Sequence, residues 1–503
     1  MELFHHVILG FQVASSWENL FFCFVGTLIG TLIGVLPGIG PVTGVAILIP
    51  ITFGMNPTTA IITMAGVYYG AMYGGSTTSI LLNVPGESSS VMTTLDGYQM
   101  ARKGRAGPAL GMAALSSFIA GTFAVLMLTL IAPILADFAI SFGPPEYFAL
   151  TLLGLTMVTS LGGDAPLKGI ISAALGILFA CFGIDAQSGV ARFTFGNVYL
   201  LDGVGFIGAA VGLFAVSEVL VNIEQPTQQI FTNAKLNLRG LLPNFQDWKD
   251  SFGAIGRGSV IGFFVGVLPG AGAAIASFIA YAAEKKCSKH PEKFGTGVIE
   301  GVAAPEGANN AAAGGALVPL LTLGIPGSGT TAVMLGALLI HGMRPGPMLF
   351  SENPEFVWGL IASMYIGNIM LIILNLPMIG LWVRLLRVPY KILMPLIITI
   401  SAVGVFVTDN NIFDVWVMFS FGLMGYLMRK LNYPAAPMVL ALVLGPMMEM
   451  ALRQSLSMSQ GSIAIIFTRP ISATLAVLAL MSLFFPLIRI LLVRCRVFKK
   501  GVV

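Results

Sequence analysis

One apolar stretch decides the fold class: ALGMAALSSFIAGTFAVLMLTLIAPIL, residues 109–135. It carries no charged residue and is longer than the roughly 20 residues that an α-helix needs to cross a bilayer. Comparable runs, each close to or above this length, occupy residues 356–383, 391–407 and 471–492. Of the 503 residues, 56% are hydrophobic and only 10% are charged, against about 25% charged in a soluble domain. We therefore predict an all-α polytopic integral membrane protein.

Basic residues at the ends of the apolar runs account for the net charge of +4. The C-terminus is rich in them, with a basic tail at residues 495–503. The positive-inside rule places such a tail in the cytoplasm, which predicts a multi-pass protein of the bacterial inner membrane. Nothing in the charge pattern indicates a nucleic-acid partner. Residues 1–18 carry apolar side chains at helical spacing, and they predict a short helix in the membrane interface.

The chain contains an internal repeat. GVLPGIG at 34–40 returns as GVLPGAG at 266–272. Downstream of each copy stands a second shared element, GGSTTSILLNVPGESSS at 74–90 and GGALVPLLTLGIPGSGTT at 314–331. The same elements in the same order predict a duplication. We place the two transmembrane repeats at residues 19–222 and 251–494, with a polar linker at 223–250.

The charges of the loops predict how the two repeats are related. The loop at 51–57, after the first LPG element, is uncharged. Its counterpart in the second repeat holds Lys285, Lys286, Lys289 and Lys293. After the Pro-Gly element the bias reverses, with Arg102, Lys103 and Arg105 in the first repeat against Arg344 alone in the second. Equivalent loops should then lie on opposite sides of the membrane, so we predict inverted-topology repeats.

Both Pro-Gly elements predict broken helices or re-entrant hairpins. Lipid cannot satisfy the backbone groups that such a break frees, so the breaks must lie inside protein or against a watery cavity. The small hydroxyl residues that follow stand at the start of a new helix, which is a ready anion site. We expect the two tips to face one cavity. The predicted substrate-binding residues are Ser76, Thr77, Thr78, Asn83, Pro85, Gly86, Ser88, Ser89, Ser90, Pro326, Gly327, Ser328, Thr330 and Thr331.

An acid and two amides stand in the small-residue segment APEGANNAAAGG, residues 304–315. Ionisable groups at membrane depth are costly and indicate function. Glu306 with its neighbouring amides could bind Na⁺ or, alone, carry a proton; an alternative is an ordinary acid that caps a helix at the interface. In the first repeat, Glu87 and Asn83 hold comparable places, and we interpret them in the same way, as candidates for cation coupling. The predicted cation-coupling residues are Gly38, Gly40, Gly270, Gly272, Glu306, Asn309 and Asn310, with a possible Na⁺ at the last three.

No enzyme motif is present in the sequence: it lacks His-Glu-x-x-His, a P-loop and a nucleophile elbow. We therefore predict that the chain is not an enzyme and holds no cofactor. Without a nucleotide site, an ion gradient is the remaining source of energy for transport.

The LPG elements, YGGSTTSILLNVPGESSS (73–90) and APEGANNAAAGGALVPLLTLGIPGS (304–328) resemble the large membrane subunit of bacterial tripartite tricarboxylate transporters. The resemblance covers nearly the whole chain. It implies a translocating subunit that imports a carboxylate, such as citrate or a related di- or monocarboxylate, with co-transported Na⁺ or H⁺. A periplasmic solute-binding protein and a small membrane subunit would be its partners. We expect alternating access of the elevator type, in which a block that carries both tips moves against a scaffold.

Two functions of other classes stay open. An anion channel would share the helices and their breaks, but it would not need hydroxyl-rich tips in both repeats to trap a ligand. A membrane-embedded enzyme would need a catalytic cluster, for example Glu306 with His341.

Overall fold

The computed structural model describes residues 2–36, 39–161, 166–185, 187–224, 238–270, 272–385 and 390–484. Within them the chain is almost entirely helical, with one two-stranded sheet. The predicted all-α polytopic architecture is confirmed. Six of the described helices are long and apolar enough to cross a membrane: Trp17–Val35, Ala106–Ala139, Phe206–Glu224, Pro354–Asn375, Ile412–Lys430 and Ala436–Met458.

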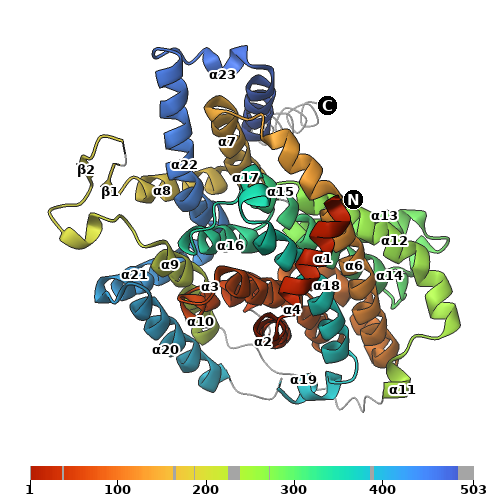
Figure 1. Ribbon diagram of the computed structural model, residues 1–503. Helices are drawn as coiled ribbons and strands as arrows, with labels where there is room; N and C mark the ends of the chain where they lie inside the picture. Colours follow the sequence, from red (N-terminus) through yellow and green to blue (C-terminus); the bar gives the residue numbers. More distant parts are fainter. Residues whose placement is uncertain are drawn as a thin grey trace, which may run out of the picture. The chain divides into compact units, whose positions relative to one another are not determined.

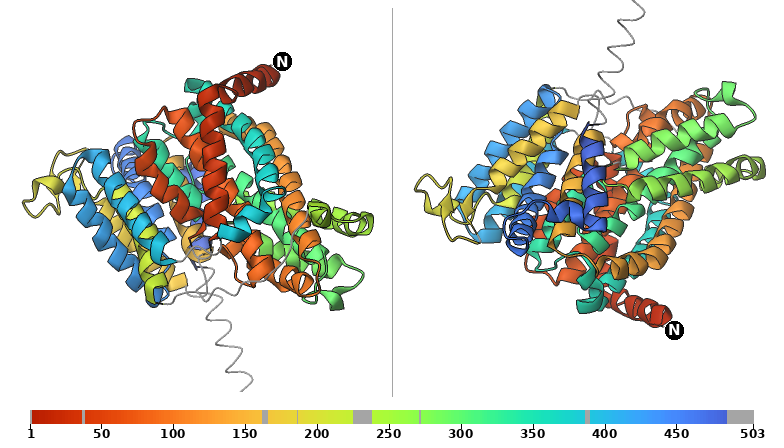
Figure 2. Two further views of the ribbon diagram at one scale, coloured as in Figure 1. Left: turned by 90° about the horizontal axis from the view of Figure 1, so that it is seen from below. Right: turned by 90° about the horizontal axis from the view of Figure 1, so that it is seen from above.

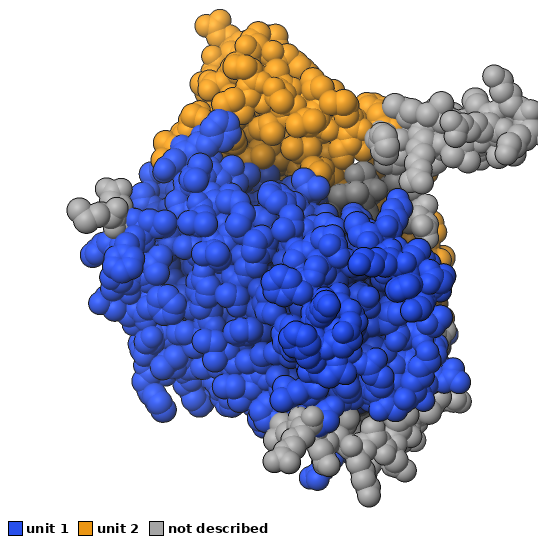
Figure 3. All heavy atoms as spheres, turned by 90° about the vertical axis from the view of Figure 1, so that its right-hand side faces the viewer, with its two compact units in different colours: residues 1–139, 207–426 blue, residues 140–206, 427–503 orange. Residues whose placement is uncertain are grey.

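The chain forms two compact units, Met1–Ala139 with Ile207–Tyr426, and Ile140–Phe206 with Leu427–Val503 (Figure 3). Both repeated elements lie in unit 1 (Figure 1). The helices of unit 1 are α1 (Glu2–Ala14), α2 (Trp17–Val35), α3 (Gly40–Thr52), α4 (Pro57–Leu82), η1 (Ser88–Ser90), α5 (Val91–Arg102), α6 (Ala106–Ala139), α9 (Phe206–Val211), η3 (Gly212–Val216), α10 (Ser217–Glu224), α11 (Leu238–Leu241), α12 (Phe245–Val267), α13 (Gly272–Cys287), η4 (Pro291–Lys293), α14 (Glu300–Gly315), α15 (Leu317–Leu323), α16 (Gly329–Ile340), α17 (Pro347–Glu352), α18 (Pro354–Asn375), α19 (Ile379–Leu385), α20 (Tyr390–Asp409) and α21 (Ile412–Lys430).

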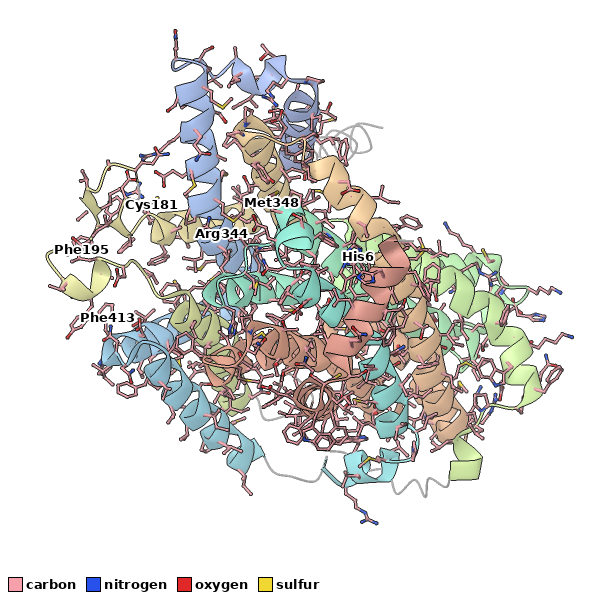
Figure 4. The ribbon with its side chains drawn as sticks, viewed as in Figure 1. His6, Cys181, Phe195, Arg344, Met348 and Phe413 are labelled. Carbon is pink, nitrogen blue, oxygen red and sulfur yellow. The ribbon has the colours of Figure 1, made fainter. Side chains whose placement is uncertain are left out.

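Unit 2 is built on helices that pack closely. A methyl group on Gly176 would lie 2.3 Å from the Met438 carbonyl oxygen, so only glycine lets these two backbones approach. After its second helix the chain forms the two-stranded sheet and a loop that exposes Phe195 (Figure 4). The elements of unit 2 are α7 (Pro144–Leu161), α8 (Pro166–Ala180), β1 (Gly183–Ile184), β2 (Ala191–Arg192), η2 (Val198–Leu200), α22 (Ala436–Met458), α23 (Ile465–Thr468) and the apolar helix Pro470–Phe484.

A ladder of glycines holds the core of the first repeat together. Gly26, Gly30 and Gly34 stand four residues apart on α2, so they share one face of that helix. A methyl group on Gly30 would lie 2.5 Å from the Val67 carbonyl oxygen, and one on Gly34 would lie 2.3 Å from that of Ala71. Small residues at this spacing let transmembrane backbones approach closely. As a result α4 is buried along almost its whole length.

The second repeat uses the same ladder, on Gly258, Gly262 and Gly266 of α12. A methyl group on Gly262 would lie 2.3 Å from the Ala308 carbonyl oxygen, and one on Gly266 would lie 2.4 Å from that of Ala312. α14 is buried from its second residue to its end. The packing of α12 on α14 therefore repeats that of α2 on α4, with Ala308 in the place of Val67 and Ala312 in the place of Ala71.

Contacts at the two ends of unit 1 agree with inverted repeats. At one end the Lys103 ammonium donates to the Thr296 carbonyl oxygen at 2.6 Å, so the two lysine-rich loops lie together. At the other end Thr58 lies beside Gly359, in the second turn of α18. The basic loop after the first Pro-Gly element thus shares a side with the basic loop after the second LPG element. Inverted repeats require this pairing of non-equivalent loops, and the side of the membrane on which each pair lies stays a prediction.

This arrangement makes a labelling prediction. In a chain without native cysteines, Lys103→Cys and Lys289→Cys should both react with a membrane-impermeant maleimide only from the cytoplasmic face. Arg344→Cys, in the turn between α16 and α17 (Figure 4), is the matched control and should react only from the periplasmic face. Labelling of positions 103 and 289 from opposite faces would contradict the inverted arrangement.

Two boundaries predicted from the sequence differ in the structure. The apolar run 356–383 is two helices, because α18 ends at Asn375 and Pro377 cannot donate the hydrogen bond that would continue it. α12 begins at Phe245, within the segment predicted as linker. Residues 225–237 of that segment and the basic tail 495–503 lie outside the described residues.

The N-terminal segment is a helix, α1, as expected. Gly10 of α1 packs against the Trp358 carbonyl, and His6 stacks on the Trp358 ring with 5.3 Å between the ring centroids. Figure 2 shows α1 (labelled N) beside α18 in both views. Its place in the membrane interface stays a prediction.

Candidate functional site

Each Pro-Gly element sits between the end of one helix and the start of a short one. Asn83 caps the end of α4 and Gly324 caps the end of α15, and both of these residues are left-handed. The helices that follow, α5 and α16, have 12 residues each. At 1.5 Å per residue they span about 18 Å, which is too short to cross a bilayer. They are half-helices, as the sequence predicted.

Each Pro-Gly pair needs its glycine because another stretch of backbone passes close to it. A methyl group on Gly86 would lie 2.2 Å from the Gly34 carbonyl oxygen, and one on Gly327 would lie 2.6 Å from that of Gly266. The two pairs therefore occupy equivalent places, each against the glycine that opens the LPG element of its own repeat. Pro326 is buried beside Gly327, whereas Pro85 is half-buried.

The LPG elements turn through left-handed glycines. Gly40 and Gly272, which begin α3 and α13, have φ of +59° and +63°, and Gly270 has φ of +81°. Only glycine adopts such angles without strain. The Gly270 amide donates to the Gly327 carbonyl at 3.1 Å, so in the second repeat the LPG turn is bonded to the Pro-Gly pair. Gly38 lies outside the described residues.

The start of each half-helix contacts the other repeat. η1, which leads into α5, packs on α13, while α16 packs on α3 and α4. The Tyr68 hydroxyl lies 3.2 Å from Ser328 Oγ, and one turn along α4 the Ser89 hydroxyl of the first tip donates to Met72 Sδ at 3.6 Å. Tyr68 therefore stands where the two tips approach each other. The sequence analysis missed it, although the run of tyrosines just before the shared element was a visible signal.

Several of the predicted substrate hydroxyls cap the half-helices. Ser328 and Thr331 form a capping box, in which Ser328 Oγ accepts from the Thr331 amide at 3.2 Å and Thr331 Oγ1 accepts from the Ser328 amide at 2.8 Å. Ser90 Oγ accepts from the Glu87 amide at 3.4 Å and from the Ser79 hydroxyl at 2.9 Å. Each cap fixes the first turn of a half-helix, where free N–H groups gather.

The other tip hydroxyls differ in their partners. Ser89 is buried and donates to the Glu87 carboxylate. Ser88 is exposed and Thr330 is buried, and no hydrogen bond joins either hydroxyl to the described part of the chain.

The remaining predicted residues of the first tip lie on α4 or just after it. Thr77 is buried, and Thr78 Oγ1 donates to the Gly75 carbonyl at 3.2 Å, within the helix. Asn83 is exposed at the end of α4. Ser76 points elsewhere, to an acidic cluster.

That cluster is centred on Glu306, which is fully buried. Its carboxylate accepts from Ser76 Oγ at 2.6 Å, from Thr93 Oγ1 at 2.5 Å and from Asn309 Nδ2 at 3.3 Å. The donors come from α4, α5 and α14, so the cluster joins both repeats. Glu306 does not cap a helix at an interface: it lies in the interior of α14.

Asn310 extends the cluster. Its Nδ2 donates to Asn309 Oδ1 at 2.5 Å and to Ser117 Oγ, on α6, at 2.7 Å. The structure thus brings together the predicted acid and both amides. Thr93 and Ser117 are further members that the sequence analysis missed, because they lie on other helices and no spacing links them to Glu306.

A second buried acid, Asp96, fastens the first half-helix to the second repeat. Its carboxylate accepts from the Tyr281 hydroxyl at 2.8 Å and from the amides of Gly297 at 2.7 Å and Val298 at 3.0 Å. It also accepts from the Gly295 amide at 2.9 Å. α5 is thereby held at the loop between α13 and α14.

Two arginines at the edges of apolar segments, Arg257 and Arg192, already form ion pairs with glutamates. Arg257 forms a bidentate pair with Glu284, with 2.7 Å for both bonds. Arg192, in unit 2, donates to Glu449 at 2.8 Å. Nearby, the Gln187 amide and the Ser188 hydroxyl, together with Arg453, lower the pKa of Asp185 to about 2, so this side chain stays charged at physiological pH.

Comparison with known proteins shows the family of the chain. Residues 20–440 match the model of the tripartite tricarboxylate transporter TctA family. A protein of Agrobacterium vitis described as "Uncharacterized 52.8 kDa protein in TAR-I ttuC' 3'region" is 47% identical over 481 residues, 95% of each chain. A second from Agrobacterium vitis, "Uncharacterized protein in TAR-II ttuC' 3'region", is 47% identical over 219 residues, 44% of this chain and 90% of that protein. No solved structure matches the chain. The chain therefore belongs to the tripartite tricarboxylate transporter TctA family and is a multi-pass membrane subunit of such a transporter.

Proposed function

We propose that this chain is the translocating subunit of a cation-coupled secondary transporter in the bacterial inner membrane, with its C-terminus in the cytoplasm, and that it has no enzyme activity. It imports a small carboxylate, such as citrate or a related di- or monocarboxylate. A periplasmic binding protein delivers the substrate, and a small membrane subunit accompanies the chain. The observation that carries the proposal is a pair of half-helices, one from each repeat, whose hydroxyl-rich starts approach each other at Tyr68.

The half-helix starts supply what a carboxylate needs. Each presents free backbone N–H groups and the positive end of a helix dipole. The hydroxyls of Ser88 and Thr330 form no hydrogen bond with the described residues. The Ser89 hydroxyl donates to Glu87, and it could donate to a substrate instead. Both nearest arginines are engaged in ion pairs. Hydroxyls and amides hold an anion less tightly than a guanidinium does, which suits a site that must also release its ligand.

The cluster around Glu306 supports cation coupling. Its carboxylate is fully buried and its hydrogen-bond donors are hydroxyls and an amide, so no described basic side chain neutralises it. A buried charge without a counter-ion is costly, and a co-transported cation offsets that cost. Glu306 and Asn310 would hold Na⁺ through their oxygens, and Asn309 would connect them through its hydrogen bonds to both. None of the hydrogen bonds to the Glu306 carboxylate comes from His341, which argues against the enzyme alternative.

Alternating access of the elevator type fits the two half-helices. A block that carries both tips moves against a scaffold that includes α6 and α18. Because η1 packs on α13 and α16 packs on α3, the two tips would travel together.

Uptake by tip variants tests the substrate site. In proteoliposomes with the binding protein, the small subunit and an inward Na⁺ gradient, Ser89→Ala and Thr330→Ala should lower citrate uptake about ten- to a hundredfold. A hydroxyl bonded to a charged group contributes about 1.5–3 kcal/mol. Ser116→Ala is the matched control, because Ser116 Oγ is buried on α6 without a partner in the described structure. Wild-type uptake by all three variants would move the substrate site away from the tips, and flux without a gradient would favour a channel.

A further inference from the structure

Two buried carboxyl groups, from the first tip and from α14, contact neighbouring residues of α4. The Glu87 side chain packs on Gly75, where a methyl group would lie 2.7 Å from Glu87 Cγ. The next residue, Ser76, donates to Glu306. Both acids are buried, at 8% and 0% exposed. Glu87 therefore lies on the same section of α4 as the Glu306 cluster.

The hydrogen-bond chain of the cluster leaves one oxygen without a donor. Glu306 accepts, so the amide nitrogen of Asn309 must face it and the Asn309 oxygen must face away. That oxygen accepts from the nitrogen of Asn310, so the Asn310 nitrogen faces Asn309 and the Asn310 oxygen faces away from it. The Asn310 oxygen is then left buried with no partner among the described residues. Such an orphaned acceptor is a ready ligand for a hard cation.

The donors to the two acids are all uncharged. Glu306 accepts from two hydroxyls and an amide, and Glu87 accepts from the Ser89 hydroxyl. Two like charges in one buried cluster repel each other, and hydroxyl groups do not remove that repulsion. A cation held by both carboxylates and by the Asn310 oxygen would remove that repulsion.

We propose that Glu87 and Glu306 hold one Na⁺ between them, and that Ser89 links this ion to the substrate. This rests on the transport function proposed above. Without the ion, Ser89 donates to Glu87. When Na⁺ binds Glu87, the ion takes the place of that donor and frees the hydroxyl to donate to a substrate carboxylate. Sodium binding therefore precedes tight substrate binding, and one hydrogen bond changes partner between the two steps.

The repeat register indicates that there is one such site and not two. With Ala308 in the place of Val67, the counterparts of Glu306, Asn309 and Asn310 in the first repeat are Ala65, Tyr68 and Tyr69. Since Gly327 takes the place of Gly86, the counterpart of Glu87 is Ser328. The second tip thus has no acid at the equivalent positions. It contributes hydroxyl and amide donors to the substrate, while the first tip couples the substrate to the ion.

Binding of ²²Na⁺ to the full-length chain in lipid nanodiscs tests this proposal directly. Glu87→Gln and Glu306→Gln should each raise the Kd for Na⁺ at least tenfold. Ser89→Ala should lower that Kd, by up to about tenfold, because the hydroxyl no longer competes with the ion for Glu87. The same variant should lose citrate uptake. If Ser89 had only a structural role, its removal would weaken both Na⁺ binding and citrate uptake. Tighter Na⁺ binding together with lost uptake therefore identifies the change of hydrogen-bond partner.

Controls separate the possible failures. Ser116→Ala should bind ²²Na⁺ as the wild type does, and thermal melting should show which variants are folded. If Glu87→Gln does not fold, Ser89→Ala still decides the question. Absence of saturable ²²Na⁺ binding to the wild type, an unchanged Kd in folded Glu87→Gln, or weaker binding in Ser89→Ala would each overturn the proposal. Intact sodium binding with no citrate uptake in the wild type would instead count against the proposed substrate.

Discussion

Replacing Glu306 with glutamine should lower sodium-driven uptake more than a hundredfold. The two hydroxyls that donate to the carboxylate, from Ser76 and Thr93, each contribute about 1.5–3 kcal/mol to a charged acceptor. Glutamine keeps the shape of the side chain but carries no charge, so the cation loses its principal ligand. A loss of about 2.7 kcal/mol already corresponds to a hundredfold change in affinity. Initial rates of citrate uptake at external Na⁺ below the half-saturating concentration of the wild type would measure the effect.

Glu300 supplies the control for this experiment. It stands in the first turn of the same helix, α14, and is only half-buried. Glu300→Gln makes the same chemical change outside the cluster and should keep near-wild-type uptake. If Glu306→Gln also transports at the wild-type rate with an unchanged dependence on Na⁺, Glu306 does not hold the coupling ion.

The second large effect should come from the glycine ladder. Gly262→Ala should sharply reduce the yield of folded, monodisperse protein and lower its thermal midpoint. The added methyl group would lie 2.3 Å from the Ala308 carbonyl oxygen, which belongs to a buried backbone and cannot move aside by a rotamer change. Overpacking of this kind typically costs about 1–3 kcal/mol, and sometimes more. The separation of α12 from α14 would also displace Glu306, so the folded fraction should transport poorly.

Gly256→Ala is the matched control on the same helix. A methyl group there would meet nothing within 4 Å. Alanine is a better helix former than glycine by about 1 kcal/mol, so this variant should be as stable as the wild type or slightly more stable. Equal melting of the two variants would mean that α12 does not pack on α14 through this face.

The sequence yields a prediction of the sidedness of the repeats because loop charge is a local property. Lysines at 285–293 and at 103 follow non-equivalent elements, and the positive-inside rule places both in one compartment. The contact between Lys103 and Thr296 agrees with that placement. The glycine ladders were equally visible, as Gly-x-x-x-Gly spacing on residues 26–34 and 258–266, but the sequence analysis did not use them.

The sequence by itself determined the class, the duplication and the half-helices. Long apolar runs fix a membrane fold, and Pro-Gly pairs break helices whatever surrounds them. It also identified Glu306 with its two amides, since an acid among small apolar residues is conspicuous. Only the tertiary structure decided which residues complete the site. Thr93 and Ser117 reach the Glu306 cluster from the first repeat, and Tyr68 meets Ser328 across the two repeats. Hydrogen bonds between residues some 200 positions apart depend on how helices pack, and no periodicity in a single chain encodes such a contact.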